Sequence, residues 1–292
     1  MEGRTQLAGA AGGLDIELSG PAGGTALLFH TGTPSAGTLY GALADAAAQR
    51  GLRTITYSRP GYGSSRRRPG RSIADCAADV AAIADELGIE RFFTVGWSGG
   101  GPHALACAAL LPERTIAAAT IAAVAPRHAA GLDWLAGMGD ENVAEFAAAQ
   151  AGEAELLVFL EQSAGALAAS SGADVAAELG DLLSAVDRAA LTMDFADYLS
   201  RAMRVGLAEG VWGWLDDDLA FMRDWGFALE RIERPVTVWQ GSEDRFVPFA
   251  HGHWLAAHVA GARARLLDGE GHLSILLGSY GPLLDDLLAS GG

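Results

Sequence analysis

The stretch Gly96-Trp97-Ser98-Gly99-Gly100 decides the fold of this chain. It is a G-x-S-x-G pentapeptide between an apolar run at residues 92–95, which predicts a short buried strand, and residues 102–110, which predict a helix. A nucleophilic serine is presented by such a strand–turn–helix, and its glycine neighbours let strand and helix pass closely. The pattern therefore predicts Ser98 as a nucleophile.

A serine hydroxyl is a poor nucleophile at neutral pH, so it needs a base and a third group that orients the base. Of the seven histidines, His272 is favoured as the base. It lies in a glycine-flanked turn between an expected strand at 264–267 and an apolar helix at 275–288. A histidine between a strand and a helix is free to point into a site.

The acid is expected after the buried strand predicted at residues 235–241. Asp244 is favoured because open α/β sheets place their sites beyond the carboxyl ends of their strands. Glu243 beside it and the more distant Asp268 are the competing candidates.

Two backbone N–H groups should bind the oxyanion that forms during acyl transfer. One belongs to Gly99, at the start of the helix, where the helix dipole favours negative charge. The other belongs to the loop after the expected strand at 26–30, where we choose Thr33 because Pro34 has no N–H to offer.

Together these pieces resemble the α/β-hydrolase superfamily, in its lid-bearing branch with esterase-like and proline iminopeptidase-like members. Residues 31–34 are similar to the family's His-Gly-x-Pro loop with Thr31 replacing histidine, and residues 58–65 to its Asp-x-Pro-Gly-x-Gly-x-Ser loop. The chain order serine, aspartate, histidine is also that of the family. The resemblance implies a mostly parallel sheet flanked by helices. Ser98 in place of an elbow aspartate argues against epoxide or carbon–halogen hydrolysis, and the elbow differs from the usual iminopeptidase Gly-Gly-Ser-Trp-Gly.

The chain is expected to form an α/β core with an inserted helical lid. Strand and helix signals alternate over residues 1–126 and resume over 234–292, whereas 127–233 is helical throughout. The helices expected in the lid span 153–169, 174–191, 195–208 and 215–225.

The lid is rich in aromatic and methionine side chains, some of which are expected to line an apolar pocket above Ser98. The candidate pocket residues are His30, Trp97, Trp212, Trp214 and Phe246. Two charged groups are interpreted as solvated: the carboxylates at 216–218 and the arginines at 66, 67, 68 and 71. The alternative for the carboxylates is a group that binds a substrate amine, and the alternative for the arginines is a contact to an anion or a carboxylate-bearing substrate.

The net charge of −16 argues against binding to nucleic acid or to an anionic membrane surface. No metal or cofactor is expected, and the expected partner is a small-molecule substrate; the oligomeric state is open. Residues 1–13 show no signal-peptide pattern, so a cytoplasmic location is expected.

The sequence thus predicts a serine hydrolase that acts by acyl transfer on a small to medium, largely apolar ester. The alternatives are an iminopeptidase or amidase, a C–C bond hydrolase, a cofactor-free haloperoxidase, and a ligand-binding protein that has lost catalysis.

Overall fold

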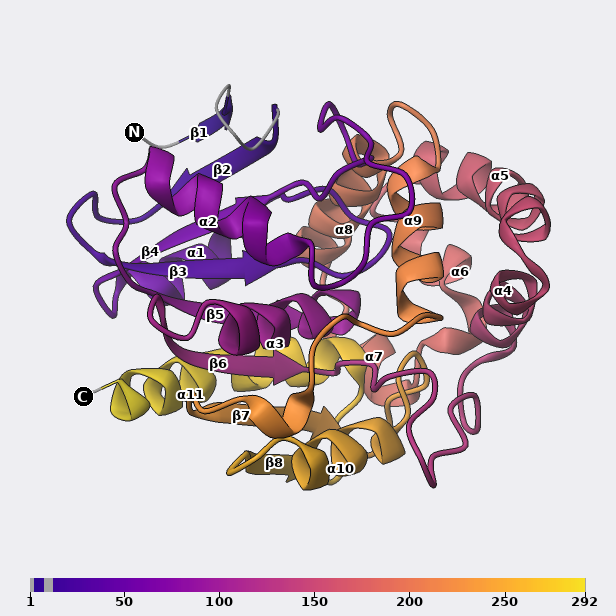
Figure 1. The fold of residues 1–292 in the computed structure, drawn as a ribbon. Coiled ribbons are helices and arrows are strands. Elements are labelled where there is room, and N and C mark those ends of the chain that lie inside the picture. The colour runs from indigo at the N-terminus through magenta and orange to yellow at the C-terminus, as the bar shows by residue number, and fades with distance from the viewer. Residues whose placement is uncertain (1–2, 8–12, 292) are drawn as a thin grey trace.

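Eight strands form one sheet through the molecule, in a computed structural model that describes residues 3–7 and 13–291 (Figure 1). The spatial order is β1-β2-β4-β3-β5-β6-β7-β8. The pairs β1–β2 and β2–β4 are antiparallel, and all pairs from β4 to β8 are parallel, which confirms the mostly parallel sheet. The strands are β1 (Gly3–Gln6), β2 (Asp15–Ser19), β3 (Thr25–His30), β4 (Leu52–Tyr57), β5 (Phe92–Trp97), β6 (Thr115–Ile121), β7 (Val236–Gly241) and β8 (Arg263–Leu267).

Helices cover both faces of this sheet. One face carries α2 (Cys76–Glu86), α3 (Gly101–Leu110) and α10 (Phe249–His258), and the other carries α1 (Gly41–Ala48) and α11 (His272–Ser290) (Figure 1). Successive strand residues point to opposite faces, so Phe92 joins one hydrophobic core and Phe93 the other. A strand buried on both faces must be apolar at consecutive positions, which explains the continuous run before the elbow.

The helix after β4 begins later than the sequence suggests. The apolar spacing of residues 72–87 predicts an amphipathic helix with Ser72 as its cap, but α2 begins at Cys76. The Ser72 N–H and hydroxyl both donate to the Asp75 carboxylate, at 2.7 and 3.0 Å. Ser72 and Asp75 thus form a local turn ahead of the helix, and the N–H groups of Cys76, Ala77 and Ala78 each bond to the carbonyl three residues back.

The described elements between β6 and β7 are all helices. This helical insertion (residues 122–235) lies beyond the carboxyl ends of the parallel strands (Figure 1). Its helices are α4 (Asp140–Ala151), α5 (Glu153–Ala169), α6 (Val175–Glu178), η2 (Gly180–Leu182), α7 (Ala185–Ala190), α8 (Met193–Gly206), α9 (Trp212–Phe221) and η3 (Leu229–Arg231). The single helix expected over 174–191 is wrong, because α6, η2 and α7 divide it, and α4 was not predicted.

No helix in the described part of the chain is both long and apolar enough to cross a membrane. Residues 1, 2 and 8–12, within the segment where no signal peptide is predicted, lie outside the described residues.

Candidate active site

Ser98 sits on a strained turn directly after β5. Its φ of 55° lies in the left-handed region, which a residue with a side chain rarely adopts. A Cβ on Gly96 would lie 2.2 Å from the Gly100 carbonyl oxygen, and a Cβ on Gly100 would lie 2.1 Å from the His30 carbonyl oxygen. Only glycine fits at these two positions, so the turn can hold Ser98 at the carboxyl edge of the sheet. Strain of this kind is typical of functional sites.

His272 is the first residue of α11, and its ring meets Asp244. The distance from Nδ1 of His272 to Oδ2 of Asp244 is 2.9 Å, and both side chains are almost completely buried. Since an ionised carboxylate only accepts hydrogen bonds, Nδ1 is the donor of this pair, and in the neutral imidazole the lone pair is then on Nε2. His272 thus has the tautomer that a general base requires.

The Asp244 carboxylate is held on both oxygens. Oδ1 accepts from the N–H groups of Phe246 and Val247 at 2.9 and 2.8 Å, and Oδ2 also accepts from the Gln240 amide at 2.9 Å. Burial raises the pKa of Asp244 above its ordinary value, although His272 and the N–H of Val247 oppose that shift. These bonds fix the orientation of the carboxylate toward His272.

The competing acids lie elsewhere. Glu243 and Asp268 are exposed, and neither hydrogen-bonds to His272 among the described residues. The structure brings Asp244 to the histidine because the turn after β7 folds its N–H groups around that one carboxylate.

Asp187, on α7, is a site residue that sequence reasoning missed. Its carboxylate accepts the N–H groups of His272, Leu273 and Ser274 at 3.0, 2.7 and 3.0 Å, so it caps α11. A Cβ on Gly271 would lie 2.4 Å from this carboxylate, which explains the glycine before the histidine. The residues are too far apart in sequence for a local capping signal.

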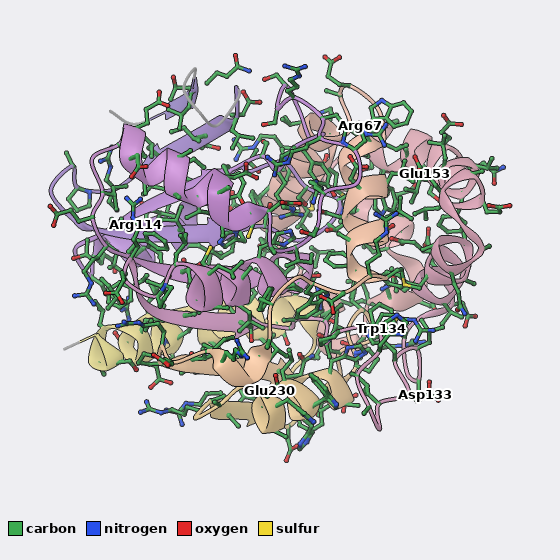
Figure 2. All side chains as sticks on the ribbon, in the orientation of Figure 1. Arg67, Arg114, Asp133, Trp134, Glu153 and Glu230 are labelled. Carbon is green, nitrogen blue, oxygen red and sulfur yellow. The ribbon has the colours of Figure 1, made fainter. Side chains whose placement is uncertain are left out.

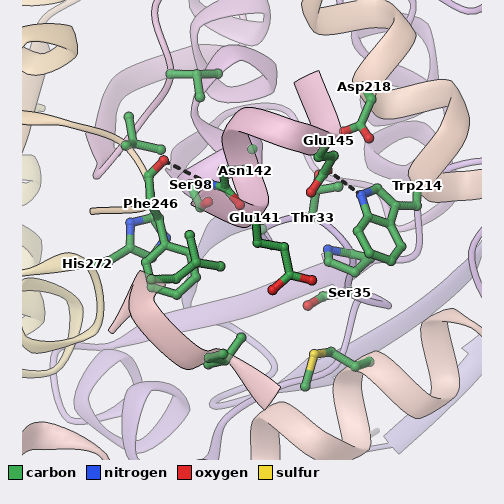
Figure 3. A pocket seen from close by; sticks show the side chains of 18 of the residues that line it. Thr33, Ser35, Ser98, Glu141, Asn142, Glu145, Trp214, Asp218, Phe246 and His272 are labelled. Carbon is green, nitrogen blue, oxygen red and sulfur yellow. Dashed lines mark hydrogen bonds between the residues drawn. The ribbon is translucent and has the colours of Figure 1, made fainter. Parts of the chain in front are cut away.

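Thr33 and Gly99, the expected oxyanion donors, face each other across the site. A Cβ on Gly99 would lie 2.6 Å from Oγ1 of Thr33, so the two loops touch. Both residues line a cavity of about 130 Å³ that is also lined by Ser98 and His272 (Figure 3). The predicted nucleophile, base and oxyanion donors therefore share one cavity.

The cavity wall is mostly apolar but carries four acids. Among the described residues, Glu141, Glu145, Glu178 and Asp218 line it, and His272 is its one basic side chain. Its apolar residues come from both the core and the insertion. They include Val124, Phe146, Leu167, Leu179, Leu182, Leu199, Met203, Phe221 and Val247.

Of the five predicted pocket residues, Trp97, Trp214 and Phe246 line this cavity. The Phe246 ring stacks on the His272 ring, with centroids 4.5 Å apart. His30 does not line it: it is buried beneath the elbow, where Nε2 lies 3.1 Å from the Thr94 hydroxyl. Trp212 does not line it either, because its ring packs under the Arg67 guanidinium, 4.4 Å away.

The interpretation of residues 216–218 as solvated carboxylates is wrong. They lie within α9 and are at most 2% exposed. Asp217 accepts hydrogen bonds from Arg59, Arg71, the Tyr62 hydroxyl and the Thr33 hydroxyl, at distances from 2.6 to 3.1 Å. Burial opposes its ionisation, but the two guanidinium groups outweigh burial and hold its pKa well below the ordinary value.

The interpretation of the arginines at 66, 67, 68 and 71 as solvated is also wrong for Arg67 and Arg71. Arg71 is only 4% exposed and pairs with Asp217, while Arg67 pairs with Asp216 at 2.9 Å. Arg67 also reaches to 3.9 Å from Glu153 on α5, so this loop is attached to the insertion at a second point (Figure 2). The charges of the two segments thus join the core to the insertion.

No group of three or more His, Cys, Asp or Glu side chains in the described part is arranged to hold a metal ion.

A serine elbow after β5, with an aspartate after β7 and a histidine after β8, defines the class of α/β hydrolases. The chain belongs to that family: the family model described as alpha/beta hydrolase fold matches residues 25–279.

Known proteins resemble the chain in part or over its whole length. The uncharacterized hydrolase YcgS of Bacillus subtilis (strain 168) is 32% identical over 103 residues, a match that spans 35% of this chain and 35% of that protein. A hydrolase from Pseudomonas aeruginosa PA01 superposes with a TM-score of 0.68 at 22% identity, covering 98% of both chains. The enol-lactonase from Burkholderia xenovorans LB400 gives 0.67 at 18% identity, covering 98% of this chain and all of that one. At these identities the two structures show a common fold.

Proposed function

We propose that this hydrolase cleaves small carboxylic esters through an acyl-enzyme formed on Ser98, with the helical insertion as its lid. The observation that carries the proposal is the 2.9 Å pair of His272 and Asp244, whose histidine shares a cavity with Ser98. A ligand-binding protein would need neither the strained serine nor the oriented histidine.

In the proposed mechanism, Nε2 of His272 takes the proton of the Ser98 hydroxyl while Oγ attacks the ester carbonyl carbon. The N–H groups of Thr33 and Gly99 bind the oxyanion, and His272 then gives the proton to the departing alcohol. Water, activated by the same histidine, releases the acid and restores Ser98. Asp244 stays ionised and stabilises the imidazolium that forms in each step.

The size and the walls of the cavity support a small, partly apolar acyl ester. About 130 Å³ is below the range of drug-sized ligand pockets. The insertion supplies apolar side chains such as Leu199, Met203 and Phe221.

A serine-directed fluorophosphonate tests this proposal. The wild-type protein should gain one label per chain, and Ser98→Ala should gain none. A series of p-nitrophenyl esters and a series of amino-acid anilides then separate esterase from amidase or iminopeptidase. Equal labelling of wild type and Ser98→Ala would contradict the assignment of the nucleophile.

A further inference from the structure

Two carboxyl groups of the insertion meet inside the cavity. Asp218 on α9 and Glu145 on α4 are 1% and 8% exposed, and both line the cavity that contains Ser98 (Figure 3). They come from different helices, so the fold of the insertion brings them together.

No N–H or O–H group of the described residues donates a hydrogen bond to the Asp218 carboxyl. Glu145 accepts from the Trp214 indole N–H at 2.7 Å, but neither oxygen of Asp218 meets an N–H or O–H donor among the described residues. Its polar neighbour is the carboxyl of Glu145, and these two share a hydrogen bond only if one of them carries a proton. The adjacent Asp217 is fully paired, so the lack of partners is specific to the side chain in the cavity.

The groups that face the pair leave a deficit of positive charge. Glu141 on α4 and Asp217 on α9 add to the negative potential, and Arg71 opposes it, but Arg71 is already bound to Asp217. Burial, together with the other acid of the pair, raises the pKa of Asp218 well above its ordinary value, and burial also raises that of Glu145. Buried carboxyls in this state are expected to be partnered, because an unpartnered one costs free energy.

We propose that Glu145 and Asp218 form a subsite for a protonated amine of the substrate, which makes the substrate an amine-bearing ester. An ammonium group supplies the N–H donors that the two oxygens of Asp218 lack and the positive charge that the cavity lacks. An organic cation also fits the apolar walls around the acids, which a hydrated metal ion does not. This proposal rests on the ester hydrolysis proposed above.

Binding of simple probes tests the subsite without turnover. Benzylammonium and benzyl alcohol are similar in shape and differ in charge, so they form a matched pair. Binding is measured by calorimetry at pH 7. The wild-type protein should bind benzylammonium about tenfold or more tightly than the alcohol, as expected for a charge-assisted hydrogen bond. Because the pKa of Asp218 lies well above its ordinary value, binding of the ammonium should also be accompanied by a release of protons.

The variants Asp218→Asn and Glu145→Gln keep the shape of each side chain and remove its charge. Each should bring the preference for benzylammonium close to unity and abolish the proton release. Glu155→Gln, which neutralises an exposed acid of α5, should leave both unchanged. Equal affinity for the two probes in the wild type, or an unchanged preference in Asp218→Asn with native circular dichroism, would overturn the subsite.

Turnover extends the test. An ester with a primary ammonium group should give a higher kcat/KM than the same ester with a hydroxyl in its place, with a ratio that collapses in Asp218→Asn. Fluorophosphonate labelling separates the two proposals. If Ser98 is labelled and both esters react equally, the subsite fails and the serine hydrolase stands. If Ser98 is not labelled but benzylammonium binds preferentially, the hydrolase mechanism fails and the subsite stands.

Discussion

The Asp217 carboxylate in the helical insertion accepts the hydroxyl of Thr33, in the predicted oxyanion loop, at 2.7 Å. The same carboxylate binds Arg59, whose guanidinium also donates to the carbonyl oxygens of Thr31 and Gly32. Three consecutive residues of the loop are therefore attached to one buried ion pair. The position of the loop depends on the insertion above it, so disturbing this pair should affect both stability and catalysis.

Asp217→Asn should destabilise the protein strongly. The variant leaves Arg59 and Arg71 buried without a counter-charge, and breaking a buried ion pair in this way costs about 3–5 kcal/mol. Urea unfolding measures the loss. Asp216→Asn is the matched control, because Arg67 is partly exposed and can be solvated when its partner is neutral; the expected cost is about 1 kcal/mol. Equal losses in the two variants would mean that the buried Asp217 ion pairs contribute no more to stability than the partly exposed pair of Asp216 and Arg67.

Thr33→Val should lower kcat more than it changes KM. Valine keeps the shape of threonine but loses the hydroxyl that donates to Asp217, so the loop loses one anchor while the cavity keeps its volume. A misplaced oxyanion donor weakens binding of the transition state more than binding of the ester, and we expect a fall in kcat of about tenfold. Steady-state kinetics on a neutral ester measures the split. A rise in KM with unchanged kcat would assign Thr33 to substrate binding instead.

Asp244→Asn should reduce kcat by about four orders of magnitude, following the serine-protease precedent, with the fold intact. The amide no longer requires the Nδ1–H tautomer of His272, so Nε2 loses its role as base. Glu243→Gln, which alters the exposed neighbour, should be nearly as active as wild type. A dead Glu243→Gln with an active Asp244→Asn would reverse the assignment of the acid.

Asp187→Asn should slow the enzyme without abolishing it. An amide oxygen can still accept hydrogen bonds from some of the three N–H groups at the start of α11. It lacks the negative charge that stabilises a helix N-terminus. We expect a loss of stability of about 1 kcal/mol and a shift in the pH–rate profile, because Asp187 also adds negative charge near Asp244. Loss of stability with an unchanged pH profile would limit Asp187 to a structural role.

Much of the site was predictable because each part has a local signal. The elbow depends on glycines within two residues of Ser98, and Asp244 and His272 each follow a recognisable strand. The family resemblance and the helical insertion follow from the same local patterns. The assignments of Ser98, Asp244, His272, Thr33 and Gly99 as catalytic groups remain predictions until they are measured.

What the sequence did not reveal depends on long-range pairing. Asp217 meets Arg59 across 158 positions of the chain, and a run of three aspartates looks solvated until its partners are known. The Asp218–Glu145 contact and the Asp187 cap have the same origin. The prediction that His30 lines the pocket is wrong. A histidine next to an oxyanion loop can point to either side of the sheet, and β3 directs this one toward α3.

The carboxyl pair of Glu145 and Asp218 should lower the free energy of unfolding as the pH rises from acid to neutral. The folded-state pKa of Asp218 lies above its unfolded value, so its contribution is fully present below the unfolded pKa, about 3.9, and is lost as pH rises through the folded pKa. Asp218→Asn removes this cost, and it should therefore be more stable than wild type at pH 8, on the order of 1 kcal/mol. The gain should shrink toward pH 4, where the wild-type Asp218 carboxyl is protonated and therefore uncharged, like the amide of the variant. Urea unfolding of both proteins from pH 4 to 8 measures the difference. A gain that is independent of pH, or a loss at pH 8, would show that the pair carries no such ionisation cost in the free protein.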